Sequence, residues 1–214
     1  MNRYPLDLSL YLVTNRVGLE LEDFFRIIHK AIKGGVKIVQ LREKGISAHE
    51  FVALAKKLQL ILKPMSVPLI INDNVDVAHV VDADGVHLGQ SDVKVSEARK
   101  ILGKRAIIGL SVENITHVIE AQNEDVNYLA ASPVFFTKTK SDCSTYWRLD
   151  DLRYACSISF HPMIAIGGIN KTNVDEVLEC GVAGVAVVSA IFDANCPVNA
   201  ATMMGKKMEA YGAL

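Results

Sequence analysis

The sequence predicts a single (β/α)8 barrel, and three features support this prediction. Eight short apolar runs rich in β-branched residues recur along the 214 residues, with amphipathic stretches between them. Apolar strands that alternate with helices indicate a parallel sheet covered by helices. The repeat of about 27 residues suits a small closed barrel. No low-complexity segment, charge block or Pro/Gly-rich linker divides the chain, so we treat residues 1–214 as one domain.

The predicted strands are short runs bounded by polar turns, as expected for strands buried on both faces. In chain order they are Leu8–Thr14, Lys37–Arg42, Pro68–Asn72, Gly85–Leu88, Ala106–Ser111, Tyr128–Ser132, Met163–Ile166 and Gly184–Ser189. An open doubly wound sheet is the alternative arrangement. The segment after the first run, Thr14–Gly18, holds a single glycine and lacks the Gly-rich dinucleotide fingerprint, which favours the barrel.

The predicted helices show apolar residues at helical spacing. They are Leu21–Lys33, Ala48–Leu62, the weaker Asn74–Val80, Ser96–Leu102, Ile115–Gln122, Asp150–Cys156, Val174–Cys180 and a last helix within Val198–Tyr211. Ser47 and Glu50 form a capping box at the start of the second helix. Glycines at Gly34-Gly35, Gly103 and Gly181 follow helix ends, where we expect left-handed backbone.

Composition narrows the classes of partner. The net charge of −1 gives no broad attraction to nucleic acid or to an anionic membrane. The four cysteines lack the short spacing of a zinc or redox motif, which favours a reduced, intracellular setting. No stretch has the length of a membrane span, and the first residues do not form a secretory signal. We therefore expect a cytoplasmic protein, and a homo-oligomer is left open.

Polar side chains follow several of the predicted strands, where barrel enzymes carry their chemistry. Gln40, Arg42 and Lys44 alternate along one strand and share a face, although long cationic side chains also reach solvent. Asp73 and Asp92 end neighbouring strands and offer the oxygen ligands that Mg²⁺ takes. Helix capping and turn formation are the competing interpretations of these two carboxylates.

The loops after the seventh and eighth strands suit a phosphate. Barrels often bind phosphate there, and Gly167-Gly168 and Val188-Ser189 allow close approach of the backbone, although the glycines also suit a tight turn. Thr137, Thr139 and Lys140 form a basic, hydroxyl-rich loop, which is either a cover for a diphosphate or an ordinary solvated loop. His87 is interpreted as an interior residue satisfied by one hydrogen bond.

The chain resembles thiamine phosphate synthase (thiamine-phosphate pyrophosphorylase) over nearly its whole length. The segments that carry the resemblance are Tyr11–Thr14, Gln40–Lys44, Ile71–Asp73, Asp84–Asp92, Ile108–Ser111, Pro133–Phe135 with Thr137–Lys140, Ala165–Ile169 and Val187–Ile191. The resemblance implies a transferase that joins hydroxymethylpyrimidine diphosphate to thiazole phosphate with Mg²⁺, giving thiamine phosphate and diphosphate.

The resemblance also implies roles for individual residues. Asp73 and Asp92 would hold Mg²⁺, and Arg42, Lys44, Ser111 and Lys140 would act in catalysis. The substrate-binding residues would be Gln40, Leu41, Arg42, Glu43, Lys44, Asn72, Ser111, Thr137, Lys138, Thr139, Lys140, Gly168, Val188 and Ser189. No protein nucleophile is needed for this reaction.

The chain departs from the family around the sixth strand. Ser132 replaces a glycine before Pro133, Phe136 and Lys138 stand where the family has prolines, and the segment 141–147 lacks the expected Gly and Pro. A related thiazole tautomerase is one rival, but it carries a histidine where this chain has Glu113. A non-enzymatic precursor-binding barrel and another phosphate-binding isomerase barrel are the other rivals. Loss of Asp73, Asp92 or Lys140 would have favoured the binding barrel, and none is lost. The isomerase barrel would explain the loops after the seventh and eighth strands, but not the set of Arg42, Lys44, Asp73 and Asp92.

Overall fold

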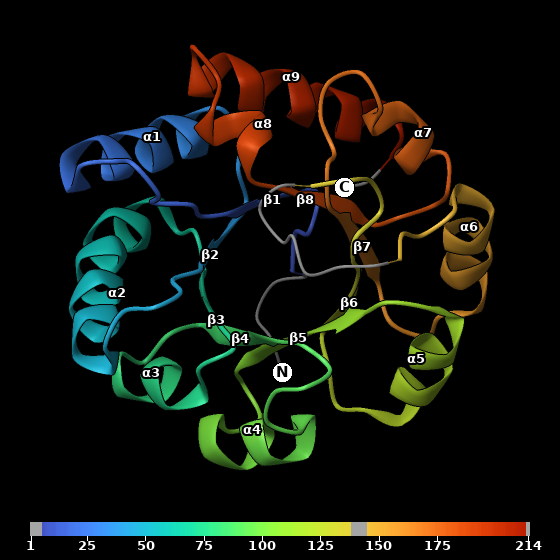
Figure 1. The fold of residues 1–214 in the computed structure, drawn as a ribbon, viewed down its shortest axis with the longest axis horizontal. Coiled ribbons are helices and arrows are strands. Elements are labelled where there is room, and N and C mark those ends of the chain that lie inside the picture. The colour runs from blue at the N-terminus through green and yellow to red at the C-terminus, as the bar shows by residue number, and fades with distance from the viewer. Residues whose placement is uncertain (1–5, 138–144, 213–214) are drawn as a thin grey trace.

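The chain forms a closed barrel of parallel strands surrounded by helices. The computed structural model describes residues 6–137 and 145–212. Within these residues each strand pairs with the next in chain order, and the eighth strand pairs with the first, Leu12 lying opposite Val187. Figure 1 looks down this ring of strands, with the helices outside it. The predicted (β/α)8 barrel is confirmed, and the open sheet is excluded.

The strands fall on the predicted runs and mostly lose a residue or two at their ends. They are β1 (Leu10–Val13), β2 (Ile38–Leu41), β3 (Leu69–Asn72), β4 (Gly85–Leu88), β5 (Ile107–Val112), β6 (Tyr128–Ala131), β7 (Met163–Ile166) and β8 (Gly184–Val187). The prediction that the last strand reaches Ser189 is wrong. The backbone leaves the extended conformation at Val188 (φ −120°, ψ −84°), and a short helix begins at Ser189.

The helices also match the sequence pattern closely. They are α1 (Leu21–Lys33), α2 (Ala48–Leu62), α3 (Val75–Val80), α4 (Val95–Leu102), α5 (Ile115–Glu120), α6 (Leu149–Ile158), α7 (Val174–Leu178), α8 (Ser189–Phe192) and α9 (Pro197–Ala210). The capping box of Ser47 and Glu50 is confirmed. Gly34 is not left-handed (φ −83°) because the left-handed turn after α1 falls on Gly35 (φ 109°).

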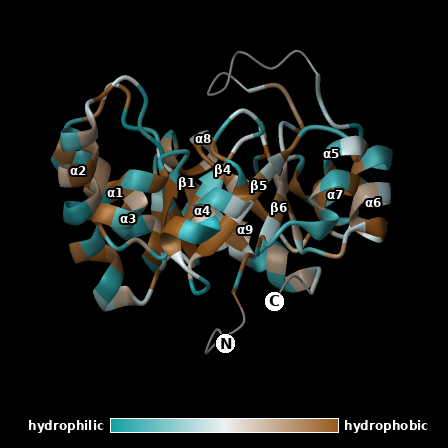
Figure 2. Ribbon diagram, turned by 90° about the horizontal axis from the view of Figure 1, so that it is seen from below, coloured by the Kyte–Doolittle hydropathy of each residue, from teal (hydrophilic) through white to brown (hydrophobic). Residues whose placement is uncertain are grey.

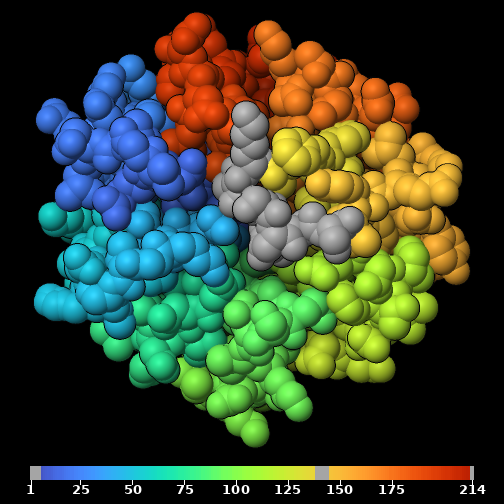
Figure 3. All heavy atoms as spheres, viewed as in Figure 1, coloured from blue at the N-terminus to red at the C-terminus, as the bar shows by residue number. Residues whose placement is uncertain are grey.

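Alternation along the strands divides the apolar side chains into two cores. The larger core lies between the strands and the helices and includes Leu12, Leu41 and Val86. The smaller core fills the barrel and includes Tyr11, Ile38 and Tyr128. Figure 2 shows the apolar residues on the strands and the inward sides of the helices. In Figure 3 the colours run around the molecule in chain order, as expected for successive β/α units.

Within the described part of the chain, no helix combines the length and the apolar character needed to cross a membrane.

Candidate active site

A cavity of about 470 Å³ opens where the carboxyl ends of the strands meet. Most of the expected site residues line it, namely Gln40, Arg42, Lys44, Asn72, Asp73, Asp92, Ser111, Thr137, Gly168, Val188 and Ser189. They come from strands on all sides of the barrel, which the chain brings together only when the ring closes. The same cavity is also lined by residues that the sequence did not single out for binding, including Tyr11, His87, Gln90, Glu113 and Ser132.

Alternate residues at the end of β2 face the cavity. Gln40, Arg42 and Lys44 line it, as the strand pattern predicts. The intervening residues differ from expectation. Leu41 is fully buried in the core between strands and helices, and the Glu43 side chain, 6% exposed, pairs with Arg16. These two side chains therefore do not line the cavity, because a strand turns every second side chain to its other face, and their role in substrate binding stays a prediction.

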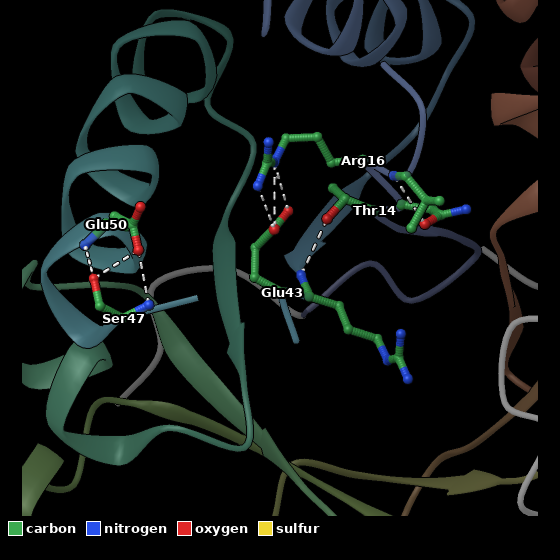
Figure 4. Close-up of polar contacts among 8 residues, drawn as sticks. Thr14, Arg16, Glu43, Ser47 and Glu50 are labelled. Carbon is green, nitrogen blue, oxygen red and sulfur yellow. Dashed lines mark hydrogen bonds and ion pairs between the residues drawn. The ribbon is translucent and has the colours of Figure 1, made fainter. Parts of the chain in front are cut away.

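The loop after β1 holds the end of β2 from the side that faces away from the cavity. The Arg16 guanidinium contacts both carboxylate oxygens of Glu43, with its Nη2 3.1 Å from Oε2 and its Nε 3.3 Å from each oxygen. The Arg42 backbone N–H donates to the Thr14 hydroxyl over 3.0 Å. Figure 4 shows the Arg16 guanidinium facing the Glu43 carboxylate, with Thr14 and the Ser47–Glu50 capping box on either side. These contacts hold the backbone of the segment that carries Arg42 and Lys44.

Asp73 and Asp92 lie close enough for their carboxyl groups to hydrogen-bond. Lys44 Nζ lies 2.6 Å from Asp73 Oδ2, at a position where the lysine side chain is 62% exposed. Asp73 has left-handed backbone (φ 61°), which costs a non-glycine residue free energy and is found disproportionately at functional sites. One cation and two carboxylates therefore meet at one edge of the cavity.

The pKa values of the two carboxyl groups move apart. Burial raises the pKa of Asp73, but hydrogen bonds to Lys44 and Asp92 and the Lys44 charge outweigh it and lower the pKa overall. Burial raises the pKa of Asp92. A hydrogen bond from the Gly89 N–H opposes this rise, and the Asp73 charge adds to it. Two carboxylates that share a site in this way repel each other, and a cation bound between them would relieve the repulsion.

Helix capping does not explain Asp73, whereas a turn hydrogen bond gives Asp92 a structural role. Asn74, not Asp73, caps α3, because its side chain accepts from the Val77 N–H. Asp92 does have a structural bond, since its Oδ2 accepts from the Gly89 N–H over 2.7 Å. Among the described residues, no group of three or more His, Cys, Asp or Glu side chains could hold a metal ion. Any metal here would take its other ligands from water and a bound ligand.

The loops after β7 and β8 form the opposite edge of the cavity. Gly167 (φ 108°) and Gly168 (φ 64°) are both left-handed. A Cβ on Gly167 would lie 2.6 Å from Pro133 Cβ, and one on Gly168 would lie 2.4 Å from the Phe136 carbonyl oxygen. Close packing against the β6 loop therefore already requires glycine here, and both residues also line the cavity.

Ser111 lies at the end of β5 and has partners on two sides. His87 Nε2 lies 2.9 Å from its hydroxyl oxygen, and Gln90 Nε2 donates to its carbonyl oxygen. His87 has two ring hydrogen bonds, not the single one expected, since its Nδ1 lies 3.0 Å from the Tyr128 hydroxyl. The buried side chains of His87 and Tyr128 thus connect Ser111 to the interior of the barrel.

The β6 loop is described only in part. Thr137 lines the cavity, while Lys138, Thr139 and Lys140 lie outside the described residues. After the gap, Trp147 packs back on the barrel, its indole N–H donating to the Val112 carbonyl oxygen over 3.1 Å. Both described parts of the loop therefore lie against the strand ends.

Similarity to known proteins agrees with this architecture. A family model described as thiamine monophosphate synthase matches residues 10–191. The chain belongs to this family. A thiamine-phosphate synthase of Clostridium botulinum (strain Loch Maree / Type A3) is 45% identical over 189 residues, which are 88% of this chain and 92% of the relative. One from Vibrio campbellii is 44% identical over 197 residues, 92% of this chain and 94% of the relative.

Solved structures support the same grouping. A thiamine phosphate pyrophosphorylase from Pyrococcus furiosus superposes with a TM-score of 0.86 at 34% identity, covering 97% of this chain and 98% of the other. A 3-hexulose-6-phosphate synthase, at 15% identity and a TM-score of 0.71, shares the fold alone. Membership of the thiamine monophosphate synthase family makes the chain an enzyme of the transferase class, as its sequence predicted.

Proposed function

We propose that the chain joins hydroxymethylpyrimidine diphosphate to thiazole phosphate at the cavity, forming thiamine phosphate and releasing diphosphate. In this reaction the bond between the pyrimidine methylene carbon and the diphosphate oxygen breaks, and its electron pair leaves with the diphosphate. The thiazole nitrogen then forms the new bond to that carbon. The observation that carries the proposal is that Arg42, Lys44, Asp73 and Asp92 line one cavity, with Lys44 paired to Asp73.

The diphosphate leaving group suits this edge of the cavity. Negative charge builds on the diphosphate as the bond breaks, and fixed positive charges lower the free energy of that transition state. Arg42 and Lys44 both line the cavity there. Their backbone is held by Thr14 and by the Arg16–Glu43 pair.

Magnesium fits the two carboxylates. Mg²⁺ prefers oxygen ligands and is commonly held by one or two carboxylates, with waters and substrate phosphates completing its shell. Asp73 and Asp92 offer such a pair, and their mutual repulsion favours a cation. When bound, Mg²⁺ supplies positive charge to the diphosphate. Lys44 already neutralises part of the charge of Asp73 and is available to turn toward the ligand.

The thiazole phosphate is assigned to the other edge. Gly168, Val188 and Ser189 line the cavity there and place backbone close to a ligand, and Thr137 extends from the β6 loop. Lys138, Thr139 and Lys140 keep the roles that family resemblance gives them. Three expectations from the sequence stay predictions. They are a cytoplasmic location, the lack of nucleic-acid and membrane partners, and a possible homo-oligomer.

The test is diphosphate release by the purified chain. We expect release only when both substrates and Mg²⁺ are present, with one thiamine phosphate formed per diphosphate. Release that needs neither the thiazole phosphate nor Mg²⁺ would indicate hydrolysis and contradict the proposal. Absence of release from folded protein would contradict it too, and interconversion of thiazole tautomers would then be the activity to assay.

Lys140→Ala tests the assignment of the β6 loop. We expect it to raise the KM for the pyrimidine diphosphate and lower kcat, because a cation that meets the leaving group would be lost. The KM for thiazole phosphate should stay the same. An effect confined to the thiazole substrate would refute the assignment.

A further inference from the structure

A connected chain of polar side chains crosses the interior of the barrel beneath the cavity. It runs from Gln40 on β2 through Tyr11 on β1, Tyr128 on β6 and His87 on β4 to Ser111 on β5. Both tyrosines are fully buried, and their neighbours inside the barrel are mainly aliphatic. A buried polar group without a partner costs free energy, so a complete chain in such surroundings is a specific feature and not a by-product of packing.

Every link of this chain has the length of a hydrogen bond. Gln40 Nε2 donates to the Tyr11 hydroxyl over 3.0 Å, and the two tyrosine hydroxyl oxygens are 2.9 Å apart. The Tyr128 hydroxyl lies 3.0 Å from His87 Nδ1, and His87 Nε2 lies 2.9 Å from the Ser111 hydroxyl. The hydrogen-bond chain thus joins four residues that line the cavity, Gln40, Tyr11, His87 and Ser111, through Tyr128, which lies inside the barrel and not on the cavity wall.

Gly109 on β5 makes room for the middle of the chain. A Cβ at this position would lie 2.1 Å from Tyr128 Cζ, 2.3 Å from its hydroxyl oxygen and 2.6 Å from His87 Nδ1. Any residue larger than glycine would therefore separate Tyr128 from His87. The strand has no positive φ at Gly109 that would otherwise call for glycine, so the contact between the two side chains is the reason for this residue.

The direction of the hydrogen bonds follows from the first one, which Gln40 donates to Tyr11. Gln40 Nε2 can only donate, so the Tyr11 hydroxyl hydrogen finds its acceptor in the Tyr128 oxygen, and the Tyr128 hydrogen in turn finds its acceptor in His87 Nδ1. An accepting Nδ1 requires neutral histidine with its proton on Nε2, and this N–H donates to the Ser111 oxygen. The Ser111 hydroxyl hydrogen then points to the cavity. Burial raises the pKa of both tyrosines, so they keep the protons that the chain needs.

We infer that Tyr11, Tyr128 and His87 are positioning residues that fix Ser111 as a hydrogen-bond donor and Gln40 as an acceptor toward an aminopyrimidine ring. The inference rests on the proposed function. An aminopyrimidine offers ring nitrogens that accept and an amino group that donates. An oxopyrimidine offers the reverse pattern, and binding it would require the Gln40 amide to turn over and every link of the chain to reverse.

Tyr128→Phe tests this inference, because it removes the central hydroxyl and keeps the ring. We expect the KM for the aminopyrimidine diphosphate to rise about tenfold, the effect of losing one well-placed hydrogen bond. The KM for thiazole phosphate should not change. Tyr154→Phe is the matched control, since Tyr154 is exposed on α6, outside the cavity. Melting temperatures of both variants show whether the fold is kept.

A second measurement reports the direction of these hydrogen bonds without any substrate. Long-range ¹H–¹⁵N correlation spectra report which ring nitrogen of a neutral histidine carries the proton, and the signals of His87 are assigned by their loss in His87→Asn. We expect the proton on Nε2 in the native chain and a mixture of tautomers in Tyr128→Phe. Tyr154→Phe should match the native chain.

Three results would overturn the inference. One is a proton on Nδ1 of His87 in the native chain, which reverses the polarity. Another is an equal rise in KM for both substrates in Tyr128→Phe. The third is a lower melting temperature of Tyr128→Phe with both KM values unchanged, which would give the buried hydrogen bonds a purely structural role. Failure of the proposed function can be distinguished from failure of this inference. In the first case the native protein would release no diphosphate, and the tautomer of His87 would still report the direction of the hydrogen bonds.

Discussion

The pairing of Arg16 with Glu43 makes a quantitative prediction about the end of β2. The Glu43 side chain is 6% exposed and that of Arg16 is 32% exposed, so the pair is intermediate between a surface and a buried ion pair. Breaking a fully buried pair costs about 3–5 kcal/mol, and an exposed pair contributes about 0–1 kcal/mol. We therefore expect Glu43→Gln to lower the free energy of unfolding by about 2 kcal/mol.

A double-mutant cycle isolates the interaction. Glu43→Gln, Arg16→Met and the double variant should give a coupling energy of about 1–2 kcal/mol, and each single variant should melt about 4–8 °C below the native chain. The measurement is thermal and urea unfolding. Glu50→Gln is the matched control, because glutamine also serves in a capping box and this exposed site should change stability by less than about 0.5 kcal/mol.

The same variant tests what the pair does for the site. Glu43 lies between Arg42 and Lys44 in the sequence, with its side chain turned to the opposite face. Loss of the pair should raise the KM for the pyrimidine diphosphate several-fold while leaving that for thiazole phosphate unchanged. A coupling energy within about 0.3 kcal/mol of zero, the range of independent sites, would refute the reasoning.

Three further predictions concern other parts of the molecule. Asp92→Ala should lower Mg²⁺-dependent turnover by orders of magnitude while the fold stays intact, and near-normal turnover in steady-state assays would count against a metal role. Gly109→Ala should destabilise the barrel by about 1–3 kcal/mol in urea unfolding through overpacking, whereas Gly205→Ala, where a Cβ meets nothing within 4 Å, should stabilise α9 by about 0.5–1 kcal/mol. Burial raises the pKa of Cys156 to about 12, so its thiol stays protonated at about pH 8 and should resist iodoacetamide. The exposed Cys196 should be alkylated under the same conditions, as peptide mass spectrometry would show. Equal labelling of the two cysteines would contradict the burial of Cys156.

Much of the barrel could be predicted because its strands are short and apolar on both faces. The eight runs stand out against polar turns, and the capping box at Ser47 marks the start of α2 within one residue. The helix α8 could not be predicted in this way. Its four residues, Ser189–Phe192, are too few to show helical spacing and continue an apolar run.

The site was predicted best where alternation along a strand was applied. Gln40, Arg42 and Lys44 line the cavity as that rule requires, whereas the family resemblance also names Leu41 and Glu43, whose side chains face away from it. Alternation alone predicts that these two side chains turn to the other face. Family motifs mark a segment, and strand geometry selects the residues within it.

The buried polar chain lies beyond what the sequence could predict. Tyr11 and Tyr128 are 117 residues apart, and His87 is 41 residues from Tyr128. Tyrosines in apolar strands are ordinarily taken as core residues, and nothing in the local pattern reveals which strands face each other across a closed barrel. The nearest sequence signal is Gly109, an isolated glycine within a strand, which indicates a close approach of other atoms.

The most direct test of the central claim is a crystal structure of the chain with hydroxymethylpyrimidine diphosphate and Mg²⁺, grown without thiazole phosphate. The account predicts the diphosphate against Arg42 and Lys44, one metal ion on Asp73 and Asp92, and the pyrimidine ring between Gln40 and Ser111. A diphosphate bound at Gly168 and Ser189, or a metal ion that leaves both aspartates unligated, would contradict it.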